Sequence, residues 1–229
     1  MNATVETPLR QSRAQRLTER LYGEDIFAGY EPELPLDLQG WNSHHPALAE
    51  ALVAARPRYV VDVGVWKGAS VAFLATQMAQ LGLRGAVIAV DTFLGSPEHW
   101  NRNRPDGIYA SLRMDRGQPM LYRQFLSNVA HLGLQASVVP MVQTSENAAM
   151  ILGRMKLNPE MVHIDAAHEY EPVLRDARRF WEILAPGGVL VGDDWSWPGV
   201  ARAAQDFAAE IGQELAISGP KWTLRKPLT

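Results

Sequence analysis

The sequence predicts an α/β fold, a doubly wound and mostly parallel sheet of seven strands with helices on both faces. Short apolar runs without alternation, typical of strands buried on both faces, alternate with helical segments of about 10–15 residues. Several of these runs end in aspartate or glycine, and ligands of such folds bind outside the carboxyl ends of the strands. The strands are expected at residues 59–63, 86–90, 136–142, 161–164, 189–191, 214–217 and 222–224.

The helices follow from periodicity and from their start and stop signals. A polar helical pattern over 12–21 is followed by prolines and an irregular segment over 29–40. Pro46 then opens a helix to residue 55, with Ser43 as the expected N-cap. We therefore expect an N-terminal helical and irregular extension over 1–40 and a main domain over 41–229. The remaining helices are expected at residues 70–80, 119–132, 145–155, 171–184 and 200–211.

Composition limits the function. The chain has 229 residues, a net charge of −3 and no cysteine. Disulfides and thiolate metal sites are therefore excluded, and nothing indicates a nucleic-acid or membrane partner. Residues 1–20 carry four arginines and two glutamates in place of an apolar signal segment. We expect a cytoplasmic protein with a small-molecule partner, and the sequence leaves open whether it forms a homo-oligomer.

A glycine-bearing turn joins the first strand to the next helix. It reads Asp-Val-Gly-Val-Trp-Lys-Gly-Ala-Ser from Asp62 to Ser70. Glycine lets the backbone approach a ligand, and the helix start offers free N–H groups; the simpler interpretation is a plain strand-to-helix turn. A dinucleotide fingerprint would need a third glycine, and Trp66 occupies the middle position, so an NAD(P)-linked oxidoreductase is disfavoured.

Carboxylates follow three other strands. Asp91 can accept both hydroxyls of a ribose; alternatively it caps a helix or is a solvated charge of a loop. Asp165 ends the fourth strand, and Asp193 and Asp194 end the fifth. Three carboxylates at adjacent strand ends repel one another unless a cation neutralises them, and oxygen ligands suit Mg²⁺, Ca²⁺ or Mn²⁺. The alternative is that one or two of them cap helices or pair with arginines.

His168 lies three residues after Asp165. The near-neutral pKa of histidine suits a general base, although a structural histidine bonded to a loop carbonyl is an equal alternative. Tryptophans in the predicted loops could hold a sugar or an aromatic ring, or simply seal the core. They are Trp41, Trp100, Trp195 and Trp197.

The residues assembled so far resemble a known family. The segment from Asp62 to Ser70 is similar to the S-adenosylmethionine (SAM) loop of class I SAM-dependent methyltransferases, which have a Rossmann-like fold. It matches the D/E-x-G-x-x-x-G-x-S variant of catechol O-methyltransferase-like enzymes. The strings at 90–100 and 163–170 resemble the bacterial macrocin O-methyltransferase and cephalosporin hydroxylase-like group, several of whose members act on sugars of natural products. The resemblance covers residues 41–229.

The resemblance implies roles for individual residues. His168 stands where catechol- and caffeoyl-CoA-type enzymes place a catalytic lysine, which leaves the identity of the base open. His168 and Asp165 are the expected catalytic residues, and a divalent cation, with Mg²⁺ as first choice, is expected on Asp165, Asp193 and Asp194. The expected SAM-binding residues are Asp62, Gly64, Val65, Trp66, Gly68, Ser70, Asp91, Thr92, Thr144, Ser145 and Asp165.

The predicted function is therefore a SAM-dependent O-methyltransferase whose catalytic domain spans 41–229 and which uses a divalent cation. Its expected acceptor is a hydroxyl of a small molecule, with a sugar or natural-product glycoside as first choice and a phenol as second. Two alternatives stay open: a metal-independent methyltransferase, and a SAM- or nucleotide-binding module without catalysis that partners an oxygenase.

Overall fold

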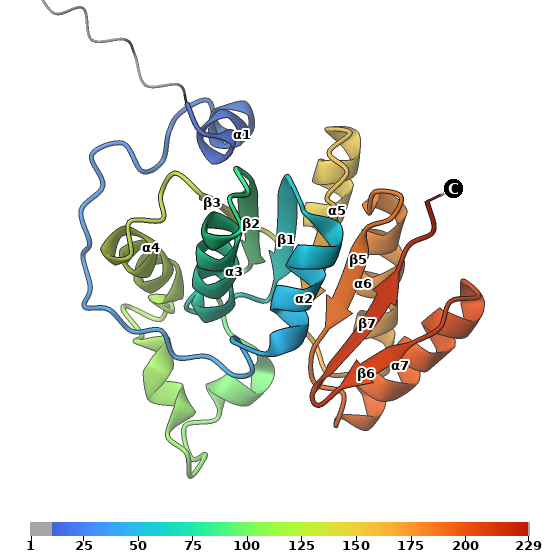
Figure 1. The fold of residues 1–229 in the computed structure, drawn as a ribbon. Coiled ribbons are helices and arrows are strands. Elements are labelled where there is room, and N and C mark those ends of the chain that lie inside the picture. The colour runs from blue at the N-terminus through green and yellow to red at the C-terminus, as the bar shows by residue number, and fades with distance from the viewer. Residues whose placement is uncertain (1–10, 229) are drawn as a thin grey trace, which may run out of the picture.

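Seven strands form a single sheet in the order β3-β2-β1-β4-β5-β7-β6 in the computed structural model, which describes residues 11–228 (Figure 1). The first five strands are parallel, and β7 is antiparallel to both β5 and β6. The strands are β1 (Tyr59–Val63), β2 (Ala86–Asp91), β3 (Val138–Val142), β4 (Met161–Ile164), β5 (Val189–Gly192), β6 (Ala216–Ser218) and β7 (Lys221–Arg225). The predicted doubly wound fold is confirmed.

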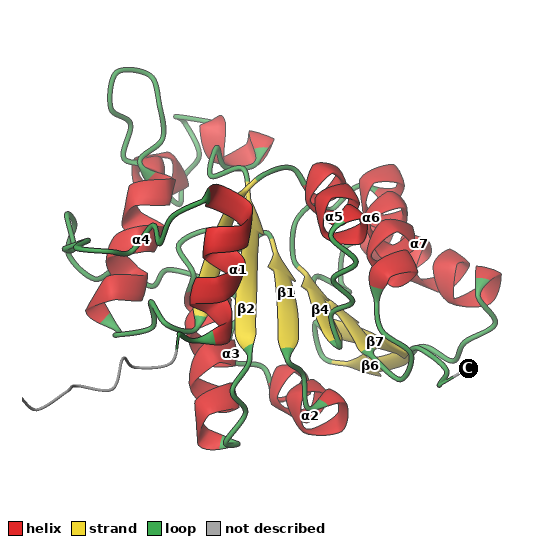
Figure 2. Cartoon of the chain, turned by 90° about the horizontal axis from the view of Figure 1, so that it is seen from above, coloured by secondary structure: helices red, strands yellow, loops and turns green. Residues whose placement is uncertain are grey.

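Helices cover both faces of this sheet (Figure 2). The helices α2, α3 and α4 pack on one face, and α1, α5, α6 and α7 pack on the other, each group with its own apolar core. Their bounds are α1 (Arg13–Tyr22), α2 (Pro46–Ala55), α3 (Ala69–Gln80), α4 (Leu121–His131), α5 (Ser145–Arg154), α6 (Tyr170–Ile183) and α7 (Pro198–Glu210). Among residues 11–228, no helix is long and apolar enough to cross a membrane.

Burial explains why the strand pattern could be read from the sequence. Every residue of β4 and β5 is buried, as is nearly all of β1 and β2. Strands covered on both faces need apolar side chains in both directions, which gives runs without alternation. The edge strand β6 is exposed throughout.

The observed ends of most elements differ from the predicted ones by one or two residues. The expected N-cap Ser43 is wrong, because His45 precedes α2 and its Nδ1 accepts the N–H of Ala47 at 3.3 Å. The third strand begins at Val138 and not at Ala136, because Ser137 donates its N–H to Leu134 in a turn. The interval between β2 and α4 also contains two short 3₁₀ helices, η1 (Pro97–Trp100) and η2 (Ile108–Leu112).

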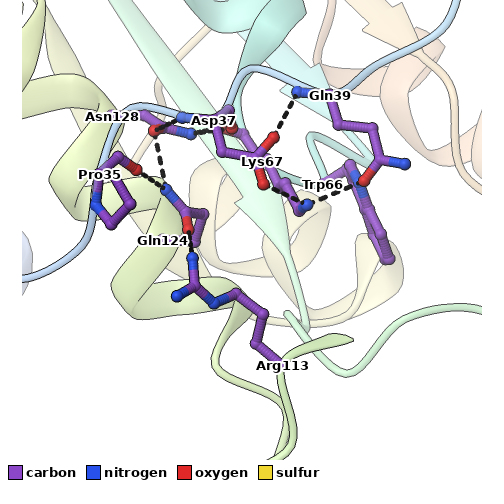
Figure 3. A network of polar contacts seen from close by, with 8 residues as sticks. All are labelled: Pro35, Asp37, Gln39, Trp66, Lys67, Arg113, Gln124 and Asn128. Atoms are coloured by element: carbon purple, nitrogen blue, oxygen red, sulfur yellow. Dashed lines mark hydrogen bonds and ion pairs between the residues drawn. The ribbon is translucent and has the colours of Figure 1, made fainter. Parts of the chain in front are cut away.

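Residues 23–45, which we call the strap, link α1 to α2 without regular secondary structure and pass around α4 (Figure 1). The side chain of Asn128 on α4 accepts the N–H of Asp37 at 2.9 Å and donates to the carbonyls of Asp37 and Lys67 at 2.6 and 2.8 Å. Lys67, which is 2% exposed, donates to Asp37 at 2.7 Å and to Gln39 at 2.8 Å (Figure 3). The strap is therefore fixed to the glycine-bearing turn, since Lys67 belongs to that turn.

Asn128→Ala is expected to lower the free energy of unfolding by roughly 2 kcal/mol or more. A buried polar group left without its partner costs about 1–3 kcal/mol, and the substitution removes partners from both Asp37 and Lys67. Urea unfolding followed by circular dichroism measures the change.

The matched control is Arg123→Ala on the same helix. Arg123 also contacts the strap, through an exposed ion pair with Glu33 at 3.6 Å. Such a surface pair contributes about 0–1 kcal/mol. An equal decrease in the free energy of unfolding in the two variants would show that the buried network stabilises the protein no more than an exposed ion pair does.

Candidate active site

A cavity of about 630 Å³ opens at the carboxyl ends of the parallel strands. Most of the predicted site residues line it. They are Gly64, Val65, Trp66, Ser70, Asp91, Thr92, Thr144, Ser145, Asp165, His168, Asp193 and Asp194. Two predicted cofactor contacts, Asp62 and Gly68, are not among its lining residues.

The two glycines of the turn are required by the backbone conformation and by the packing of neighbouring residues. Gly64 has a φ of +83°, and a Cβ there would lie 1.8 Å from the carbonyl oxygen of Asp165. Gly68 has a φ of +91°, and a Cβ there would lie 2.9 Å from the ring of Phe125. Gly64 is therefore needed because β1 passes close to the end of β4. The sequence analysis had attributed this glycine to the close approach of a ligand.

The turn presents the start of α3 to the cavity. No side chain among residues 11–228 caps this helix, and Ala69 and Ser70 of its first turn line the cavity. The N–H groups of a first helical turn lack intrahelical partners and, together with the helix dipole, favour an anion. The arrangement can therefore hold a carboxylate.

Asp91 lies beside this turn at the end of β2. Its carboxylate accepts the N–H groups of Trp66 at 2.8 Å and Phe93 at 2.7 Å. Burial raises the pKa of Asp91, while these N–H groups act in the opposite direction. Each carboxylate oxygen can accept a further hydrogen bond, which suits a pair of ribose hydroxyls.

A buried chain of polar groups runs beneath the cavity. The Nδ1 of His163 lies 2.7 Å from Asp62, and Lys221 Nζ lies 2.9 Å from the His163 Nε2 and 2.7 Å from Asp193. Because an ammonium group can only donate, the His163 Nε2 accepts and its Nδ1–H donates to Asp62. Asp62 was expected to contact the cofactor, but it is fully buried and orients His163.

The predicted metal triad is not assembled in this arrangement. Asp193 accepts from Lys221 through one oxygen and from Asn42 and the Asp194 N–H through the other. Asp194 pairs with His168 at 2.9 Å. Within residues 11–228, the three metal-ligating types that come within 4.8 Å of one another are His163, Asp165 and Asp193. With Lys221 bonded to two of these three, the residues do not fit a divalent cation.

Asp165 is the free carboxylate of the site. It lines the cavity, and no side chain among residues 11–228 forms a hydrogen bond with it. Burial and the neighbouring carboxylate of Asp193 raise its pKa well above the usual range, against the opposing charge of Lys221. A carboxylate with a raised pKa is suited to accept a proton near neutral pH.

His168 connects three loops. Its Nε2 lies 2.9 Å from Asp194, its Nδ1 lies 3.5 Å from Glu98, and its ring stacks on Trp197 with centroids 4.5 Å apart. The hydrogen bond with Asp194 raises the pKa of His168. These contacts favour a protonated ring that holds the loops together, and the predicted role of His168 as a base stays a prediction.

Aromatic side chains form one wall of the cavity. Trp41 of the strap is 52% exposed, and its ring stacks at 6.3 Å on His99, which lies 4.4 Å from Trp66. Sequence reasoning noted Trp41 but missed His99 and Lys221. Nothing local indicates Lys221, because a lysine in an edge region of a sheet usually faces solvent.

Comparison with known proteins decides the family. A family model described as a methyltransferase domain matches residues 61–195. The chain belongs to this methyltransferase family. The predicted enzyme class and the predicted resemblance to class I methyltransferases are therefore confirmed. No curated protein sequence matches the chain.

Solved structures of other methyltransferases share the fold at low sequence identity. The O-methyltransferase TomG from Streptomyces achromogenes, solved with SAM, is 14% identical with a TM-score of 0.57, and the match covers 97% of this chain and 92% of TomG. An O-methyltransferase from Bacillus cereus, solved with S-adenosylhomocysteine (SAH), is 13% identical with a TM-score of 0.54 over 96% of this chain and 94% of its own. The calicheamicin methyltransferase CalS11 is 19% identical with a TM-score of 0.54, and the match covers 95% of this chain and 94% of CalS11.

Proposed function

We propose that the chain is a SAM-dependent O-methyltransferase that methylates a hydroxyl of a small molecule, with a sugar as first choice and a phenol as second. The observation that carries the proposal is the position of Asp165. This carboxylate shares one cavity with Asp91 and with the start of α3, and within the described part of the chain no side chain bonds the carboxylate or caps the helix. A site for a nucleoside and a site for a proton acceptor therefore lie side by side.

The residues present fit SAM. The carboxylate of Asp91 would accept the ribose hydroxyls, and the first turn of α3 would receive the carboxylate of the methionine part. The expected contacts of Thr144 and Ser145 with the adenine are consistent with their place in the cavity wall. When bound, SAM supplies an electrophilic methyl group. The neighbours TomG and the Bacillus cereus enzyme were solved with SAM and SAH.

The chain itself contributes a base and a fixed geometry. Asp165 accepts the proton of the acceptor hydroxyl at a carboxylate oxygen, which makes the acceptor oxygen a better nucleophile. Lys221 and Asn42 hold Asp193 in place beside it. Alignment of the reacting groups can lower the barrier by about 7–11 kcal/mol, so rigid strand ends are a suitable support.

The aromatic wall supports a ring-shaped acceptor. Trp41 and Trp197 line the cavity with about half of their surface exposed, at 52% and 49%. Flat aromatic faces pack well against sugar or phenol rings. CalS11 is described as a TDP-rhamnose 3′-O-methyltransferase, which favours the sugar as first choice.

The test is methyl transfer from isotopically labelled SAM. The purified protein is incubated with nucleotide sugars, glycosides and catechols, and products are detected by the added labelled methyl mass. We expect transfer to a sugar hydroxyl. Tight SAM binding without transfer to any acceptor would contradict the proposal and favour a non-catalytic SAM-binding module.

A further inference from the structure

Lys221 has an unusual position for a lysine. Its side chain is 0% exposed, although it begins β7, next to the exposed edge strand β6. Lysine is almost never fully buried unless its charge is paired. Here Nζ is paired with Asp193 at 2.7 Å and with His163 at 2.9 Å.

The groups that bond Lys221 are metal-ligating types. His163, Asp165 and Asp193 have ligand atoms within 4.8 Å of one another. A histidine with two carboxylates is a donor set that divalent ions such as Mn²⁺ accept. The ammonium group of Lys221 lies within hydrogen-bond distance of two of the three, so it occupies the place that an ion would need.

Charge gives the reason for this arrangement. Asp62, Asp165 and Asp193 lie close together in a buried region, and their mutual repulsion would be strong without a positive charge. Lys221 supplies that charge from within the chain, and the ring of His163 connects it to Asp62. A fixed ammonium group thus does part of what the predicted cation was expected to do.

We propose that Lys221 is a built-in replacement for the divalent cation. Methyl transfer by this chain then requires no metal, and removal of the amino group converts His163, Asp165 and Asp193 into a divalent-cation site. Lys221 is a positioning residue, because it acts on the acceptor through Asp193 and Asp165. The statement about methyl transfer rests on the proposed function, whereas the statement about the metal site does not.

The first experiment titrates Mn²⁺ into the full chain by calorimetry, without SAM or acceptor. Wild type is expected to show no saturable binding, and Lys221→Met, which keeps an apolar chain of similar length, is expected to bind one ion. At a Mn²⁺ concentration about a hundredfold above the dissociation constant, the melting temperature of this variant should rise by roughly 5–10 °C. The double variant Lys221→Met/Asp193→Asn removes both charges of the pair and should bind no ion.

The second experiment measures methyl transfer by wild type after exhaustive chelation. Full activity is expected, with no increase when Mn²⁺ or Mg²⁺ is added back. Saturable Mn²⁺ binding by wild type that Asp165→Asn abolishes would overturn the proposal, as would loss of activity on chelation and its recovery with the ion.

A folded Lys221→Met variant that binds no Mn²⁺ would also overturn the proposal. If that variant does not fold even with Mn²⁺, the wild-type titration decides, because saturable binding there is incompatible with an occupied site. Since these titrations contain no acceptor, failure to find a methylated product leaves their outcome unaffected.

Discussion

Asp165→Asn is expected to lower kcat by about 10²–10⁴-fold, the usual contribution of a general base. The amide keeps the shape of the side chain but cannot accept the hydroxyl proton as a carboxylate does. The affinity for SAM, measured by calorimetry, should stay close to that of wild type, because no side chain among residues 11–228 forms a hydrogen bond with the Asp165 carboxylate that would shape the nucleoside part of the cavity. Single-turnover kinetics at saturating SAM measure the loss.

The pH profile gives an independent check on Asp165. A base must be deprotonated to act, so activity falls as the pH drops through its pKa. Since burial and Asp193 raise the pKa of Asp165, the acid limb of kcat should lie above the usual carboxylate range and should be absent in Asp165→Asn. The control is Asp115→Asn, which removes an exposed carboxylate outside the cavity. Wild-type kcat in Asp165→Asn would eliminate this residue as the base.

Asp91→Ala is expected to weaken SAM binding by at least about 100-fold. A hydrogen bond to a charged group contributes about 1.5–3 kcal/mol, and two ribose hydroxyls would lose such a partner. The substitution also frees the N–H groups of Trp66 and Phe93, which Asp91 holds at 2.8 and 2.7 Å. Calorimetry with SAH measures the affinity, and kcat at saturating SAM should change far less than the KM for SAM.

A second variant separates the two effects of Asp91. Trp66 and Phe93 donate to different carboxylate oxygens of Asp91. Asp91→Asn therefore keeps an acceptor for only one of these N–H groups and loses the charge, so its SAM affinity should fall between wild type and Asp91→Ala. Together with Asp165→Asn, these variants should separate two functions within one cavity. Asp91 is expected to determine SAM binding, and Asp165 the rate of methyl transfer. An SAH affinity within threefold of wild type in Asp91→Ala would place the ribose elsewhere.

The sequence by itself determined the architecture and the location of the site. Strands such as β1 and β4 are buried on both faces, so their residues are apolar without alternation. Residues that follow parallel strands must gather at one edge of the sheet, which is why Asp91 and Asp165 could be assigned to the same cavity. Both properties follow from local pattern and from the geometry of parallel sheets.

Only the tertiary structure decided what each carboxylate binds. Lys221 meets His163 across 58 residues of sequence, and Asn42 meets Asp193 across 151. The sequence indicated that neighbouring carboxylates need a positive charge, but it did not say whether a distant lysine or a metal ion supplies that charge. The position of the lysine depends on long-range packing. The register of β7 against β5 places Lys221 beneath the cavity. No local sequence pattern indicates that register.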